Sequence, residues 1–146
     1  MLTTYKAVAK KLPGGLQVET KARTFKIIQD EPKAMGGTDE GMSPVETLLC
    51  ALGACQVIVG YAYAKFQGVS FEDFHVELEG DIDLDGFKGV KGVRPGFQTI
   101  RYNMVFKTNE SQEKMEKFAE FIENTCPVGD SLVNGVKLVK AGVIRE

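Results

Sequence analysis

The sequence has few of the residues that build common metal sites and catalytic triads. Its one histidine, His75, stands between acidic neighbours in an alternating segment. None of the three cysteines has another cysteine, or the histidine, at zinc-site spacing. Zinc centres and histidine-dependent triads are therefore not expected. Residues 81–86 match the start of a calcium-binding loop, but Gly92 stands where such a loop needs a glutamate. We predict no metal and no cofactor.

Neither an excess of basic residues nor a leader segment is evident. The 18 Lys and Arg against 20 Asp and Glu give a net charge of −2, which argues against a nucleic-acid partner. Residues 1–12 contain no apolar run of the kind found in secretory signals. Three cysteines are too few for a secreted disulfide scaffold. We therefore expect a cytoplasmic location, with reduced thiols.

The longest apolar run, residues 48–64, has Gln56 as its only strongly polar member. Its length is at the lower end of what a membrane-spanning helix needs. It also contains Gly53 and Gly60 and is closed by Glu46 and Lys65. A helix that is apolar on all sides also fits the buried centre of a globule or a dimer. We prefer this second interpretation and predict no membrane partner.

Periodicity and turn residues predict one domain, residues 1–146, of the α+β class. Helix start signals are clear at Ser43, with Pro44 at the first helical position and Glu46 completing a capping box. Gly68 is placed to end this long helix. The other expected elements are strands at 4–11, 16–21, 70–83, 97–107 and 136–144 and a helix at 111–125; residues 24–28 continue the second strand or form a third.

The three cysteines differ in what their neighbours predict. Cys55 lies in mid-helix among apolar residues, where a free cysteine is usually a small buried side chain. Cys126 precedes Pro127 and is placed to cap a new helix, where the dipole and free N–H groups favour a thiolate. We therefore expect a low pKa for Cys126. Cys50 is about 140° round the helix from Cys55, and we expect it to pack in the core.

Two motifs together resemble those of the OsmC/Ohr family, named for osmotically inducible protein C and organic hydroperoxide resistance. The string SPVETLLCALGAC, from Ser43 to Cys55, is similar to the family's central-helix motif. Cys126-Pro127-Val128, followed by Ser131-Leu132, is similar to its second motif, and Gly36-Gly37 before the helix also fits. With the order of elements, the resemblance covers nearly the whole chain.

The resemblance implies a fold and a chemistry. The fold is an intertwined homodimer in which antiparallel sheets wrap around long central helices. The chemistry is a stress-response, thiol-based peroxidase reaction: Cys55 attacks a hydroperoxide and becomes a sulfenic acid, and Cys126 condenses with it to a disulfide. An external dithiol, of which the lipoyl group is one type, then reduces this disulfide.

The chain departs from the hydroperoxidase branch around the first cysteine. In that branch an arginine activates the cysteine and pairs with a glutamate ten residues before it. Here Val45 holds that position and the glutamate is Glu46, about 180° from Cys55 on a regular helix. The loop before the helix contains no arginine. Arg23, on the adjacent strand, is the cation we expect as the substitute.

We therefore predict an enzyme that reduces hydroperoxides, with apolar organic ones as the preferred substrates because Cys55 has apolar neighbours. The candidate catalytic residues are Cys55, Cys126, Arg23 and Glu46. The alternative is a non-enzymatic small-molecule-binding protein or thiol redox sensor on the same fold. If no cation lies near Cys55 and its thiol reacts slowly with hydroperoxides, the alternative is favoured.

Overall fold

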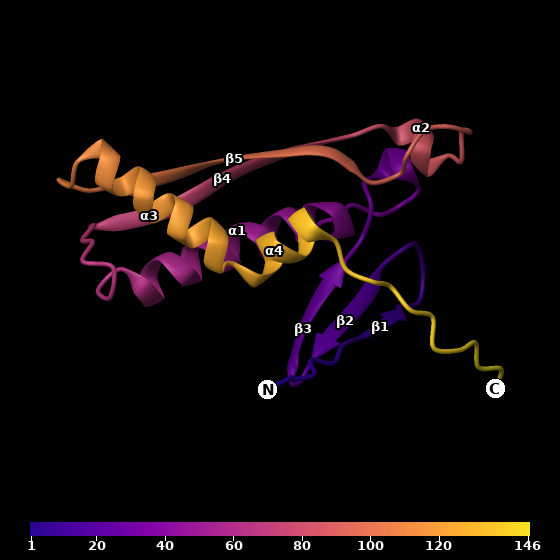
Figure 1. Ribbon diagram of the computed structural model, residues 1–146. Helices are drawn as coiled ribbons and strands as arrows, with labels where there is room; N and C mark the ends of the chain where they lie inside the picture. The colour runs from indigo at the N-terminus through magenta and orange to yellow at the C-terminus, as the bar shows by residue number, and fades with distance from the viewer. The chain divides into compact units, whose positions relative to one another are not determined.

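The computed structural model describes residues 1–146, which form two compact units, Met1–Cys50 and Ala51–Glu146. The boundary falls within one helix, α1 (Pro44–Tyr63). Each unit contributes one antiparallel sheet, and the predicted α+β class is confirmed (Figure 1). The assignment of residues 1–146 to one domain stays a prediction.

The first unit begins with a three-stranded meander. Its strands are β1 (Val8–Lys11), β2 (Val18–Ala22) and β3 (Phe25–Gln29), paired in that order. Residues 24–28 thus belong to a separate third strand. A two-residue turn, Arg23-Thr24, joins β2 to β3, and Arg23 adopts a positive φ of 57° there. Arg23 therefore lies at the tip of a hairpin.

A loop with one 3₁₀ turn, η1 (Lys33–Met35), connects β3 to α1 and is organised by a single carboxylate. Asp30 is 2% exposed and accepts hydrogen bonds from the Thr38 hydroxyl and from the backbone N–H groups of Glu31, Thr38 and Glu40. The Thr38 hydroxyl bond, followed by the backbone N–H bonds, lowers the pKa of Asp30 to about 2 against the opposing effect of burial. The loop is therefore built around an ionised side chain.

The predicted capping box at the start of α1 is confirmed. The Ser43 hydroxyl accepts a hydrogen bond from Glu46 N (3.3 Å), and the Glu46 carboxylate accepts one from Ser43 N (2.7 Å). The helix ends at Tyr63, and a turn follows as far as Gly68, which has a φ of 65°. Gly68 thus closes the turn after the helix rather than the helix itself.

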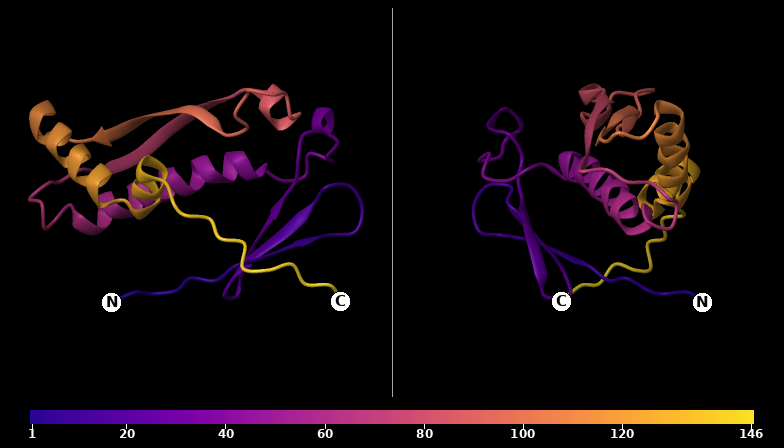
Figure 2. Two further views of the ribbon diagram at one scale, coloured as in Figure 1. Left: turned by 45° about the vertical axis from the view of Figure 1, so that its right-hand side comes forward. Right: turned by 90° about the vertical axis from the view of Figure 1, so that its left-hand side faces the viewer.

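The second unit contains a long hairpin and three further helices. Strands β4 (Asp73–Ile82) and β5 (Phe97–Lys107) pair in antiparallel register, and α2 (Leu84–Phe87) lies in their connection. Helix α3 (Gln112–Thr125) leads at Cys126 into α4 (Pro127–Asn134). Figures 1 and 2 show α3 running back along the hairpin, with α4 following it.

Two glycines allow α1 and β4 to approach closely. A Cβ atom at Gly60 would lie 2.5 Å from the Phe74 ring, and one at Gly53 would lie 2.6 Å from a methyl of Leu78. A side chain at either position would force Phe74 or Leu78 to move, so glycine is favoured here despite its low helix propensity. The core beside these glycines contains Val59, Val69, Phe74, Met115, Phe118 and Ile122.

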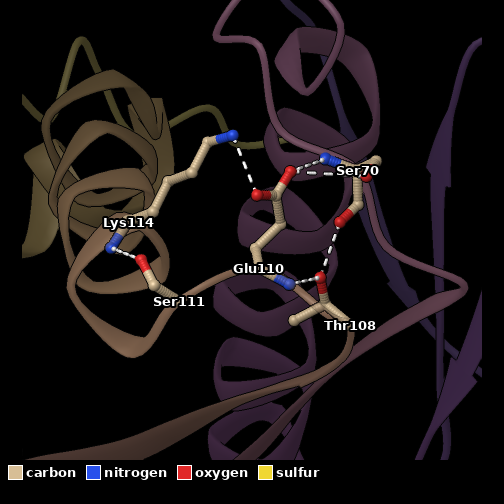
Figure 3. A network of polar contacts seen from close by, with 5 residues as sticks. All are labelled: Ser70, Thr108, Glu110, Ser111 and Lys114. Atoms are coloured by element: carbon tan, nitrogen blue, oxygen red, sulfur yellow. Dashed lines mark hydrogen bonds and ion pairs between the residues drawn. The ribbon is translucent and has the colours of Figure 1, made fainter.

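A polar network fixes the turn before β4 against the turn before α3 (Figure 3). The Glu110 carboxylate accepts hydrogen bonds from Ser70 N and Lys114 Nζ. The Thr108 hydroxyl donates to Ser70 O (2.7 Å) and accepts from Glu110 N. Ser111 caps α3 by accepting from Lys114 N (3.2 Å). The network therefore sets the position at which α3 begins.

The predicted last strand, residues 136–144, is wrong for this chain. The segment after α4 forms no helix or strand, and its large apolar side chains are exposed. The sequence has the alternation of a strand, but β1–β3 and β4–β5 pair only among themselves. A strand needs a neighbour to satisfy its backbone groups, so the pattern alone does not form one.

Helix α1 is long and apolar enough to cross a membrane by length and composition, with a mean hydropathy of 1.6, and 28% of this apolar stretch is buried. Only one face of it packs in this chain. The other face exposes large apolar side chains, including Ile58 (67%) and Tyr61 (51%). This exposed face is what a partner surface would have to cover.

Candidate functional site

The site is centred on Cys126, at the junction of α3 and α4. Cys126 caps α4, with Pro127 at the first helical position, and its Sγ accepts a hydrogen bond from Gly129 N (3.3 Å). The predicted N-cap is therefore confirmed. The side chain is only 1% exposed, so no small molecule reaches it directly from solvent.

The expected low pKa of Cys126 is wrong. Burial raises the pKa of this thiol, and the neighbouring Cys55 thiol raises it further. The N–H groups of Gly129 and Val128 act in the opposite direction, as the helix N-terminus was expected to do. Burial disfavours the charged thiolate more than two backbone donors stabilise it, so Cys126 is held as a neutral thiol.

Cys55, on α1, is the partner of Cys126. Both cysteines are free and lie in the second unit, and Cys55 is near enough to raise the pKa of Cys126. Cys55 is half-buried and therefore reachable by a small molecule. Two thiols in this arrangement can exchange between a dithiol and a disulfide.

Cys50 does not belong to this site. It is exposed, and the expectation that it packs in the core is wrong. The face of α1 that packs in this chain contains Leu52, Gln56 and Val59, and Cys50 does not project from it. Periodicity could not distinguish the faces of a helix that is apolar on all sides.

A second group of polar residues, in the same unit as Cys126, was missed from the sequence. The Tyr102 hydroxyl donates a hydrogen bond to Glu123 Oε1 (2.9 Å). Burial, then the interactions with Glu123, raise the pKa of Tyr102 to about 12; a hydrogen bond with Gln56 lowers it, and Cys126 raises it. Gln56 is 2% exposed, and its Oε1 has no hydrogen-bond partner.

One signal for this group was present in the sequence. Gln56 interrupts an apolar run next to Cys55, and a buried polar residue generally has a structural or functional partner. Tyr102 and Glu123 could not have been linked to it, because their proximity depends on how β5 and α3 pack.

The other two predicted site residues, Arg23 and Glu46, lie in the first unit. The Arg23 guanidinium lies over the Phe25 ring, 4.9 Å from its centre. The Glu46 carboxylate is bonded to Ser43, which lowers its pKa. The two residues do not form an ion pair with each other. Their role in activating Cys55 stays a prediction.

No group of three or more His, Cys, Asp or Glu side chains is arranged to hold a metal ion. The acidic residues that resembled a calcium loop have another role. Asp83 caps the short helix α2 by accepting a hydrogen bond from Asp85 N (3.0 Å).

Comparison with known proteins gives one consistent result. A family model described as OsmC-like protein matches residues 37–139. The uncharacterized protein YmaD of Bacillus subtilis is 31% identical over 111 residues, which cover 73% of this chain and 71% of that protein. An OsmC-like protein from Mycoplasma pneumoniae superposes with a TM-score of 0.79 at 20% identity, covering 93% of this chain and 91% of the other. For an organic hydroperoxide resistance protein from Legionella pneumophila the TM-score is 0.69 at 19% identity, with 90% of each chain covered.

Proposed function

Because the chain belongs to the OsmC-like family, we propose that it is a cytoplasmic thiol peroxidase. In this proposal Cys55 reduces hydroperoxides and Cys126 resolves the product. Organic hydroperoxides are the preferred substrates, because the neighbours of Cys55 along α1 are apolar. The likeness to organic hydroperoxide resistance proteins in fold is consistent with this substrate class.

The observation that carries the proposal is the contrast in exposure between two neighbouring thiols. Cys55 is half-buried, whereas Cys126 is 1% exposed and near enough to Cys55 for that thiol to raise its pKa. A peroxide from solvent can reach the first thiol and not the second. In this proposal, Cys126 reacts with the sulfenic acid that forms on Cys55. This asymmetry supports the assignment of Cys55 to attack and Cys126 to resolution.

The reaction has three steps. The Cys55 thiolate attacks the O–O bond; its sulfur keeps one oxygen as a sulfenic acid, and the other leaves as an alcohol after gaining a proton. The Cys126 sulfur then forms the S–S bond as the S–O bond of Cys55 breaks, and the hydroxyl leaves as water. An external dithiol reduces the disulfide and is itself oxidised.

We also propose that the working form is a homodimer. The exposed apolar face of α1 and the unpaired segment 136–144 both lack a covering surface in one chain. A second copy would offer a matching helix face and unpaired strand edges. This arrangement explains the apolar helix without a membrane.

The test measures consumption of an alkyl hydroperoxide by the reduced protein, with a dithiol present for turnover. Cys55→Ser should abolish consumption. Cys126→Ser should permit one turnover and leave a sulfenic acid on Cys55, because the first step does not need the resolving thiol. Cys50→Ser is the matched control and should react as the wild type does. Wild-type rates no faster than those of free cysteine would contradict the proposal.

One observation favours a second candidate, a thiol redox sensor. Glu46 is bonded to Ser43, and Arg23 lies over Phe25, so the arginine–glutamate pair of the hydroperoxidase branch is not formed by these residues. A sensor would form the disulfide once and turn over slowly. Sustained turnover with excess dithiol distinguishes the enzyme from the sensor.

A further inference from the structure

A groove that the thiol chemistry does not use runs between β5 and α3. Its volume is about 520 Å³, and residues of both elements line it. At one end Tyr102 is bonded to Glu123, and at the other Thr108 is bonded to Glu110. Strand and helix therefore run in opposite directions along the groove, as Figures 1 and 2 show. The groove follows most of the length of α3.

The floor of the groove is apolar. Met104 and Phe106 of β5 and Met115 and Ala119 of α3 are its more buried lining residues. Methionine side chains adapt their shape to what packs on them, and the methylene chain of a charged molecule packs well on such a surface. The floor therefore suits an aliphatic chain.

Two carboxylates on the rim of the groove keep their charge. Glu116 and Glu123 are exposed lining residues. The Gln112 side-chain amide donates a hydrogen bond to Glu116 Oε1 (3.2 Å), and the Tyr102 hydroxyl donates one to Glu123 Oε1 (2.9 Å). Both donors are neutral, so they hold the carboxylates in place without cancelling their charge. The two lysines of α3 form ion pairs with other glutamates.

The spacing of these carboxylates indicates the shape of a ligand. Glu116 and Glu123 are seven residues apart on α3, which places them on one face and about 10.5 Å apart along the axis. The small Ala119 lies between them. A molecule lying along the groove would therefore meet a negative charge near each end and apolar surface in the middle.

Strand β5 adds hydrogen-bond acceptors along the same groove. It pairs only with β4, so alternate carbonyl groups on its other edge have no strand partner. An ammonium group has three donors and no acceptor. Carbonyls and carboxylates together therefore favour a ligand that carries ammonium groups.

We propose that this groove binds a linear alkylamine with an ammonium group at each end, the class that contains aliphatic diamines and polyamines. One ammonium pairs with Glu116 and the other with Glu123, and the methylene chain lies over Met115 and Ala119. A single cation would leave one carboxylate unpaired. The volume is that of a small-molecule site. This site uses neither Cys55 nor Cys126, so it is independent of the proposed function.

The test is isothermal titration calorimetry of the full chain with diaminooctane, whose extended chain separates its two ammonium groups by about the spacing of the carboxylates. Octylamine has the same chain with one charge, and diaminobutane has both charges on a shorter chain. Diaminooctane should bind about fivefold more tightly than either, which is the upper range for one exposed ion pair. Its affinity should fall at high salt, because salt screens exposed charges.

Charge-neutralising variants identify the site. Glu116→Gln and Glu123→Gln keep the hydrogen-bond acceptors, and each should weaken diaminooctane binding by about fivefold. Each should also make the affinities for diaminooctane and octylamine nearly equal, because the second ammonium has lost its partner. Glu120→Gln, the matched control, makes the same charge change on α3 outside the groove. It should leave both affinities unchanged.

Several results would overturn this site. They are an absence of diaminooctane binding, equal affinities of the wild type for diaminooctane and octylamine, and an equal loss of affinity in Glu120→Gln, which would assign binding to the general charge of α3. A chain that lacks residues 136–146 tests another occupant of the groove. If diaminooctane binds only to this shortened chain, the basic segment of a second copy fills the groove and the ligand site is refuted.

Discussion

At the scale of single residues, the chemistry depends on how one fold gives two thiols different environments. Cys126 is at a helix N-terminus, which favours a thiolate, yet it is also fully buried, and burial dominates. A neutral resolving thiol is stable against oxidation until Cys55 has reacted. Cys55 would then react before Cys126 because peroxide can reach it from solvent, and not because its thiol is the more acidic.

Arg23 is the cation expected to substitute for the arginine of the hydroperoxidase branch. If its guanidinium stabilises the Cys55 thiolate, Arg23→Gln should slow the first step by about tenfold or more and shift its pH dependence upward, because a nearby cation favours the charged form. The measurement is the rate of Cys55 thiol loss across pH. Lys21→Gln, which removes a cation paired with Glu19 on the same hairpin, is the control. If Arg23→Gln and Lys21→Gln slowed the first step equally, the positive charge of the hairpin, and not Arg23 in particular, would be the cause.

At the scale of elements, the start of α1 is set by two carboxylates with different roles. Glu46 closes the capping box with Ser43, and Asp30 holds the loop that precedes it. The capping box was predictable, because its pattern is local. The Asp30 cluster was not, because its donors lie eight and ten positions away in a loop without periodicity.

Asp30→Asn should lower the free energy of unfolding in a pH-dependent way. The folded-state pKa of Asp30, about 2, is below its ordinary value of 3.8. Its contribution to stability is therefore present above the ordinary pKa and is lost as the pH falls towards 2. The urea midpoint of the variant should be lower than that of the wild type at pH 7, and the difference should shrink near pH 2.

The control for this change is Asp39→Asn, in the same loop. Asp39 is exposed and has a φ of 59°, which asparagine tolerates. Asp39→Asn should therefore change the urea midpoint little at pH 7 or at pH 2. A midpoint difference for Asp30→Asn that is the same at pH 7 and pH 2 would show that its charge is not the cause.

At the scale of the whole molecule, much of the fold was predictable where signals are local. Strand β5 has its predicted bounds, 97–107, and the helix predicted at 111–125 is α3, which begins one residue later, after Ser111. The predictions were wrong where the structure or burial of a segment depends on what packs against it. Segment 136–144 has a strand pattern but no partner strand, and Cys50 lies in an apolar helix with an uncovered face.

The same surfaces predict a dimer. Detergent-free sedimentation should give about twice the 16.0 kDa of one chain, because the exposed face of α1 is too apolar to remain in water. Removing residues 136–146 should weaken the association if this segment pairs with a partner's strand edge. A stable monomer of the full chain in the absence of detergent would contradict the dimer.

The central claim, that Cys55 and Cys126 act as a pair, is tested most directly by peptide mapping after treatment with one equivalent of an alkyl hydroperoxide. The account predicts a Cys55–Cys126 disulfide and a free Cys50. Closing a loop of this length should stabilise the oxidised protein by about 4 kcal/mol in the chain-entropy model. A disulfide that contains Cys50, or a peroxide-treated protein in which all three thiols remain free, would contradict it.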